Sequence, residues 1–299
     1  MKQKTNTEFR RVMRKIVRNP SAMLGFFLLI FFVIIAIFAP LLAPVDNEDN
    51  PYQMTPTKYH GKMLWKSNPI PPETEHPFGI IGKYDIWYGV IWGTRSAFKI
   101  GLTVSIISSI IGLIVGSIAG YFGGMIDEIM MRITDVFMSI PFLVAAMIMT
   151  TILGKGLDKV TIALIVFGWM QVARLIRGNI LQAKEEQYVL AAKALGISHA
   201  KIIVKHLLPN TIFPVVVQMS MRMGSLVITA AALSFLGVGA EMGYADWGTI
   251  LSYSRNYMLE LNRSWFAVVF PGTAMVLFVL AWNLVGDALR DIFDPKMRA

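Results

Sequence analysis

Six stretches of the sequence are long, apolar and almost free of charge, and they constrain the fold more than any other feature. An α-helix rises about 1.5 Å per residue, so roughly 20 apolar residues cross the hydrocarbon core of a bilayer. The fourth stretch is short, but Leu175 and Ile176 extend it if Arg174 snorkels to the interface. The pattern predicts an all-α membrane protein with six transmembrane helices. The stretches are residues 21–45, 100–126, 136–154, 160–173, 207–240 and 264–286.

Composition excludes an ordinary soluble protein. Hydrophobic residues make up 55% of the 299 residues and charged residues only 16%, whereas a soluble domain has roughly 25% charged residues. The mean hydropathy of +0.56 excludes a disordered chain. Cysteine is absent, which excludes disulfides, thiolate metal sites and thiol nucleophiles.

The first apolar stretch is predicted to be a retained membrane helix rather than a cleaved signal peptide. A basic segment precedes it, as in a signal peptide, but its apolar run exceeds the usual length of about 7–15 residues. The pairs Ala39–Pro40 and Ala43–Pro44 are typical of a helix end at the interface, because proline cannot continue a helix.

Basic residues are concentrated in two segments, and this distribution predicts the orientation. Residues 1–20 hold seven basic residues and one acid, and residues 174–206 hold six basic residues and two acids. The segments 45–93 and 241–263 are slightly acidic. Because cytoplasmic loops are rich in Lys and Arg, both termini are expected in the cytoplasm. Residues 127–135, with three acids and one base, run against this pattern.

The same two segments account for the net charge of +9. Nucleic acid is one interpretation of a basic chain, but no basic face with interleaved aromatic residues accompanies these charges. Fixing the topology and contacting anionic lipid headgroups explains them more simply. We therefore expect membrane lipid as a partner, and no nucleic acid.

Two further segments are long enough to fold outside the membrane. Residues 46–95 are rich in proline, which favours loops with short β pieces. Residues 241–263 contain Trp247, Tyr253 and Tyr257, which suit an interfacial helix near the headgroups. The chain is thus expected to have four parts: a cytoplasmic basic segment (1–20), a first transmembrane helix (21–45), an extracytoplasmic loop (46–95) and a core of five spans (96–299).

Residues 182–209, here called the 182–209 loop, carry the strongest local pattern. They predict a short helix, then Gly196 in a left-handed conformation, then a second helix capped by Ser198. An amphipathic hairpin resting on the membrane is the simplest interpretation, although the small alanines also leave room for another backbone. The apolar stripe of the first helix consists of Tyr188, Ala191, Ala192 and Leu195.

The spacing of Ala191–Ala192, Gly196 and Leu208–Pro209 resembles the EAA loop of ATP-binding cassette importer permeases. In that family the loop forms a coupling helix that docks in a groove of the ATPase subunit. The glutamate that names the motif is Leu190 here. The residues that the resemblance assigns to ATPase coupling are Tyr188, Leu190, Ala191, Ala192, Leu195, Gly196, Leu208 and Pro209.

Motifs along nearly the whole chain resemble the peptide-transporter branch of that family, in which the chain is similar to the C-type permease. Two departures stand out: Ile80–Asp85 replaces the usual Thr-Asp and Gly-Arg-Asp, and Ala230 stands where a glutamate is frequent. The matching motifs are Arg18-Asn19-Pro20, His76-Pro77-Phe78-Gly79, Tyr121-Phe122-Gly123-Gly124, Leu233-Ser234-Phe235-Leu236-Gly237, Asp246-Trp247-Gly248, Asn283-Leu284 and Gly286-Asp287.

The resemblance implies the type I importer permease fold, as a multi-pass protein of the bacterial inner or plasma membrane. The implied partners are a second homologous permease, two ATPase subunits, an extracytoplasmic substrate-binding protein and a peptide. ATP and Mg²⁺ would be bound by the ATPase subunits, so this chain is expected to hold no cofactor or metal and to be no enzyme. Oligopeptides are favoured over dipeptides, and import of nickel or oligosaccharides stays open, because the binding protein largely sets specificity.

Arg222 is the one charge deep in an apolar stretch. It lies about 18 Å along the fifth span if that span starts near Asn210. A charge at this depth usually faces a cavity or a partner. Two roles therefore stay open: Arg222 lines a translocation path, or it contacts the second permease.

The sequence contains none of the motifs for phosphate binding, zinc proteolysis or a nucleophile elbow that would indicate catalysis. The histidines lie outside the spans and lack metal-ligand spacing. A stand-alone secondary transporter or channel is the alternative from another class. The absence of carboxylates for ion relay in the spans argues against it.

Overall fold

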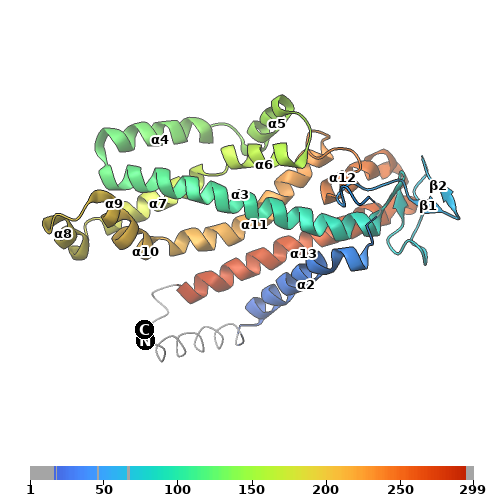
Figure 1. Cartoon of the computed structure of the whole chain (residues 1–299), viewed down its shortest axis with the longest axis horizontal. Coiled ribbons are helices and arrows are strands. Elements are labelled where there is room, and N and C mark those ends of the chain that lie inside the picture. Colours follow the sequence, from blue (N-terminus) through green and yellow to red (C-terminus); the bar gives the residue numbers. More distant parts are fainter. Residues whose placement is uncertain (1–16, 18, 46, 66–67, 294–299) are drawn as a thin grey trace.

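The computed structural model describes residues 17, 19–45, 47–65 and 68–293. Its long helices run side by side, with two small β-hairpins at one end (Figure 1). Five spans are long and apolar enough to cross a membrane, and a bent pair of helices makes a sixth if the pair counts as one span. The five are α2 (Pro20–Leu42), α3 (Ile86–Phe122), α6 with α7 (Leu157–Val166 and Met170–Ala183, with a short break between them), α11 (Phe213–Phe235) and α13 (Leu261–Phe293). Within the described residues, the chain is therefore mostly helical, as predicted, with five or six candidate spans.

The third span differs from the single helix expected over residues 136–154. α4 (Gly124–Met138) and α5 (Phe142–Leu153) are separated by a short break at Pro141 and bent by 83°. Pro141 has no N–H to continue the ladder of α4, so the chain restarts as α5. The sequence did not reveal the bend, because residues 127–135, with three acids and one base, were interpreted as a loop before the apolar stretch 136–154 and not as part of a helix.

The three acids that run against the charge pattern lie in α4: Asp127 and Asp135 are paired with arginines of α7, and Glu128 is paired with Arg132 of α4 itself. Arg177 donates two hydrogen bonds to the carboxylate of Asp127, from Nε at 2.5 Å and from Nη2 at 2.6 Å. Arg174 makes an ion pair with Asp135. These two ion pairs fasten α4 along α7, so the acids are partly neutralised within the bundle rather than free in a loop.

α3 begins at Ile86, well before the expected boundary near residue 96, and its first turns complete the end of α2. Pro40 cannot donate the hydrogen bond that the Ala36 carbonyl would accept in a regular helix. Arg95 donates to that carbonyl and to the carbonyl of Ile37. Trp87 and Trp92 donate their indole N–H groups to the carbonyls of Leu42 and Ala43, at 2.9 and 3.0 Å.

A stripe of glycines lets α3 and α7 approach closely. Gly112, Gly116 and Gly120 recur every four residues and so lie on one face of α3. A Cβ atom built on Gly116 would lie 2.2 Å from the carbonyl oxygen of Ala173. Small residues at such spacing are the usual means by which transmembrane helices pack backbone to backbone.

The end of the bundle formed by residues 47–85 carries the hairpins and is called the hairpin end. The predicted short β pieces are confirmed as two antiparallel hairpins. His76 Nδ1 lies 2.5 Å from Asp85 Oδ2, while Asp85 Oδ1 accepts the N–H of Tyr88 and caps α3. Phe78 stacks on Phe270 of α13, with centroids 4.0 Å apart. The strands are β1 (Lys58–Tyr59), β2 (Lys62–Met63), β3 (Ile80–Ile81) and β4 (Tyr84–Asp85).

The segment expected as an interfacial helix is instead packed inside the hairpin end. It forms α12 (Trp247–Ser254) and the 3₁₀ helix η2 (Arg255–Glu260). Trp247 is only 1% exposed and donates to the carbonyl of Val90 at 3.1 Å. Asp246 caps α12 through the N–H of Thr249, and its burial raises the pKa of its carboxyl. The aromatic residues indicated a helix at the membrane–water interface, but Trp247 is hydrogen-bonded to α3 and α12 is packed within the protein.

Candidate functional site

The 182–209 loop lies at the end of the bundle opposite the hairpins, here called the loop end (Figure 1). It folds into α8 (Gln187–Ala194), α9 (His199–Ile202), the π-helix η1 (Ile203–Leu207) and the start of α10 (Leu208–Thr211). Gly196 has φ of +70°, the left-handed conformation that the sequence predicts for a residue ending the first helix. Ser198 precedes α9 in an extended conformation but makes no side-chain capping hydrogen bond.

One face of the loop is buried against the bundle. Val189 is fully buried and Ala192 is 4% exposed. They belong to one apolar cluster with Ile180 of α7 and with Ile202 and Leu207 from the second half of the loop. Val189 was missed in the expected stripe, although its spacing of three from Ala192 puts both on one helical face.

Polar contacts also fix the loop to α3 and α7. The hydroxyl of Tyr121 lies 2.8 Å from His199 Nδ1. Lys184 donates to the carbonyl of Gly120 at 3.2 Å, and Asn179 donates to the carbonyl of Thr211 at 3.2 Å. The Tyr-Phe-Gly-Gly motif at residues 121–124, which forms the junction of α3 and α4, thus lies beside the loop.

The opposite face of α8 is apolar and exposed. Leu195 is 79% exposed and Tyr188 40% exposed, and Ala191 between them is exposed as well. These three residues form what we call the outer face of the loop. Leu190, at the position of the motif glutamate, is 47% exposed beside it. The predicted stripe is therefore split, because Ala192 turns inward while the other three members turn outward.

The remaining two predicted coupling residues, Leu208 and Pro209, lie at the start of α10. Leu208 packs partly against the apolar cluster beneath the loop. Pro209 is exposed and sits in the first turn of α10, where its missing N–H costs no helical bond. The preceding turn is a π-helix. This form is rare in proteins, and where it does occur it is often found at functional sites.

Arg222 points at a break in the fourth span. Its Nη1 donates to the carbonyl of Gly168 at 2.7 Å, and Gly168 lies in the gap between α6 and α7. The sequence did not reveal this partner within the chain. Arg222 also lines a cavity of about 370 Å³ with Gln171, Ser225 and Thr229, next to the bend between α4 and α5.

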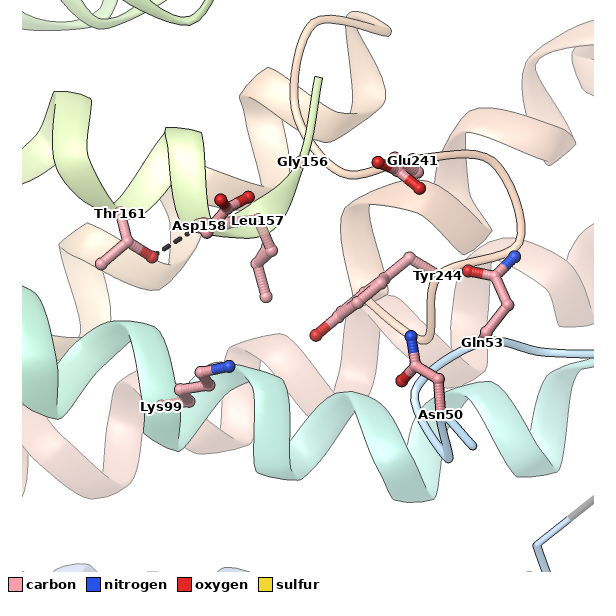
Figure 2. A pocket seen from close by; sticks show the side chains of 9 residues that line it. All are labelled: Asn50, Gln53, Lys99, Gly156, Leu157, Asp158, Thr161, Glu241 and Tyr244. Atoms are coloured by element: carbon pink, nitrogen blue, oxygen red, sulfur yellow. Dashed lines mark hydrogen bonds between the residues drawn. The ribbon is translucent and has the colours of Figure 1, made fainter. Parts of the chain in front are cut away.

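A second polar cavity, of about 250 Å³, lies at the hairpin end and was missed by the sequence (Figure 2). Its walls come from four segments far apart in the chain, so no local motif announces it. Burial raises the pKa of Tyr244, whose ring stacks on Tyr52, to about 12. The lining residues are Asn50, Gln53, Lys99, Gly156, Leu157, Asp158, Thr161, Glu241 and Tyr244.

No group of three or more histidine, aspartate or glutamate side chains suited to a metal ion occurs among the described residues. His76 and His199 are engaged by Asp85 and Tyr121 instead. Both histidines thus have structural partners.

Comparisons with known proteins cover nearly the whole chain. Residues 112–299 match the family described as binding-protein-dependent transport system inner membrane component, and residues 7–59 match the N-terminal TM domain of oligopeptide transport permease C. The dipeptide transport system permease protein DppC of Bacillus subtilis is 34% identical over 287 residues, covering 95% of this chain and 85% of that protein.

Two further relatives have similar coverage. The oligopeptide transport system permease protein OppC of Bacillus subtilis is 33% identical, with 94% of this chain and 87% of that protein covered. The glutathione transport system permease protein GsiD of Escherichia coli O6:K15:H31 is 35% identical, with 98% and 92% covered.

Proposed function

The chain belongs to the family of binding-protein-dependent transport system inner membrane components, and we propose that it forms part of the path through which an ATP-driven importer moves peptides. As a member of this family, it is a multi-pass protein of the plasma membrane. Relatives named for dipeptides, oligopeptides and glutathione support a peptide substrate. We further propose a preference for oligopeptides over dipeptides.

The single observation that carries the coupling role is the outer face of the 182–209 loop. Tyr188, Ala191 and Leu195 are apolar yet exposed on a helix whose other face is anchored. Exposed apolar residues on a rigid element indicate an interaction site. We assign this face to an ATPase subunit, which would bind ATP and Mg²⁺, with a second copy serving the homologous partner permease.

The packing suggests how movement of the ATPase would reach the membrane. Val189 of α8 and Ile180 of α7 belong to one apolar cluster, and α7 packs on α3 through the glycine stripe. The loop also continues directly into α10 and α11. A shift of the outer face would therefore tilt the fourth and fifth spans together, which is the kind of two-state motion that alternating access needs.

The loop end is proposed to face the cytoplasm and the hairpin end the substrate-binding protein. α2 begins and α13 ends on the side of the bundle that faces the loop end (Figure 1), and Asn19 donates to Asp291 there at 3.5 Å. This arrangement and the basic residues of the N-terminal segment support the proposal that both ends of the chain are cytoplasmic. The expected cytoplasmic segment 1–20 lies almost entirely outside the described residues.

Reconstitution tests this function directly. The chain, its partner permease and two ATPase subunits in proteoliposomes, with the binding protein outside, should accumulate radiolabelled peptide only when ATP is inside. Tripeptides and pentapeptides should compete better than dipeptides. Uptake driven by an ion gradient without ATPase subunits would instead support a secondary transporter, and uptake of nickel or oligosaccharide but not peptide would refute the substrate class.

For Arg222 we propose a dual role: it bridges the break in the fourth span and offers its remaining donors to the cavity on the translocation path. Arg222→Gln should leave the Gly168 carbonyl without its charged donor and lower peptide uptake at least tenfold, because such hydrogen bonds are worth about 1.5–3 kcal/mol. Arg222→Lys should retain part of the rate. Unchanged uptake and substrate range in both variants would refute a role in the path.

A further inference from the structure

We infer that the 250 Å³ cavity at the hairpin end binds the two charged ends of a short free peptide, with Lys99 taking the carboxylate and Glu241 the ammonium group. This inference rests on the proposed peptide substrate. It adds a binding site made by this chain alone, outside the 182–209 loop and away from Arg222.

Lys99 lies in a membrane-spanning helix, where its ammonium group needs water or an anion nearby. It lies on α3, a membrane-spanning helix, and its side chain is exposed. A lysine directed into lipid is costly. Its ammonium group instead enters the cavity, 5.8 Å from the centre of the Tyr52 ring, and among the described residues it has no ion-pair partner.

Two carboxylates line the cavity, those of Asp158 and Glu241, and only the first has an ion-pair partner among the described residues. Asp158 is paired with Lys159 at 2.8 Å. Glu241 has no such partner in the described part of the chain and lies on the far side of Tyr244 from Lys99 in the view of Figure 2. One free cation and one free anion therefore line the same space, which is the complement of a zwitterion.

Tyr244 and the cavity size narrow the ligand further. The Tyr244 phenol is neutral at physiological pH, as an ordinary tyrosine is, and burial raises its pKa further, so no third charge lies between the other two. The cavity volume of about 250 Å³ is small compared with the roughly 300–1,000 Å³ of pockets for drug-sized ligands. A short peptide with both ends free fits these limits better than a long chain.

The test measures equilibrium binding to the complete importer in nanodiscs, without the binding protein. The probes are trialanine, N-acetyl-trialanine and trialanine amide. Wild type should bind trialanine roughly tenfold more tightly than either blocked form, because each loses one charged hydrogen bond. Lys99→Met should remove only the preference over the amide, and Glu241→Gln only the preference over the acetylated peptide.

Lys62→Met and Glu75→Gln are matched controls, since both side chains are exposed at the hairpin end and neither lines the cavity. They should retain both preferences. Absence of binding, absence of an end-group preference, or equal weakening of all probes by Lys99→Met and Glu241→Gln would overturn the inference.

ATP-dependent uptake of trialanine by the same wild-type complex separates the two proposals. If uptake occurs but binding shows no end-group preference, the cavity site is wrong and the importer function stands. If no peptide is taken up by the wild-type complex, the proposed function fails and the cavity site fails with it.

Discussion

Replacing Leu195 by aspartate is expected to abolish ATP-driven uptake while leaving the chain folded and inserted. Leu195 is 79% exposed, so the change removes almost no packing inside the chain. It does place a charge on the outer face, where docking of an ATPase subunit would have to desolvate it. Changing a residue that contributes strongly to an interface costs about 2 kcal/mol or more, which is roughly a thirtyfold loss of affinity.

Co-purification of the ATPase subunits with the tagged permease measures this effect. Trp65→Asp is the matched control, because Trp65 is 73% exposed at the hairpin end and is remote from the loop. Ala192→Asp should differ from both, since Ala192 is 4% exposed and the change also lowers the thermal stability of the permease. Normal ATPase association and uptake in Leu195→Asp would refute the docking assignment.

Gly116→Ala is expected to lower the stability of the permease strongly, although alanine is normally the better helix former. The added methyl group would lie 2.2 Å from the Ala173 carbonyl oxygen and 2.3 Å from Ile176 Cγ2. α3 and α7 would have to separate, and overpacking of this kind costs typically about 1–3 kcal/mol. Because α7 carries the loop, uptake should fall together with stability.

Gly178→Ala on α7 is the matched control, since nothing lies within 4 Å of a Cβ atom at that position. Both variants make the same gain in helix propensity, about 1 kcal/mol, so their difference isolates the close approach. The measurement is the thermal unfolding temperature of the purified complex in detergent. Equal unfolding temperatures for the two variants would show that α3 and α7 tolerate wider spacing.

Much of the fold was readable from the sequence. Long uncharged runs predict spans because lipid offers no hydrogen bonds to the backbone, which leaves helices as the economical solution. Gly196 was predicted as a left-handed residue and has φ of +70°. The family resemblance rested on motifs whose packing is now visible, such as Asp246–Gly248, where a Cβ on Gly248 would lie 2.1 Å from the Ala231 carbonyl oxygen.

The site was only partly readable, because periodicity gives the faces of a helix but not which face meets the bundle. Ala191 and Ala192 are the same residue at adjacent positions, yet Ala191 is exposed and Ala192 is buried. Arg222 was expected to meet the path or another subunit, and its partner at Gly168 exists only because the fourth span is broken there.

By itself the sequence indicated a multi-pass membrane protein, its resemblance to a permease family and a distinctive loop at residues 182–209. These properties depend on local composition and on the spacing of residues, both of which can be seen in the sequence itself. The tertiary structure alone decided the ion pairs between α4 and α7, the inward packing of α12 and the placement of Lys99 and Glu241 on one cavity. Each depends on contacts between segments far apart in sequence, and no local pattern encodes them.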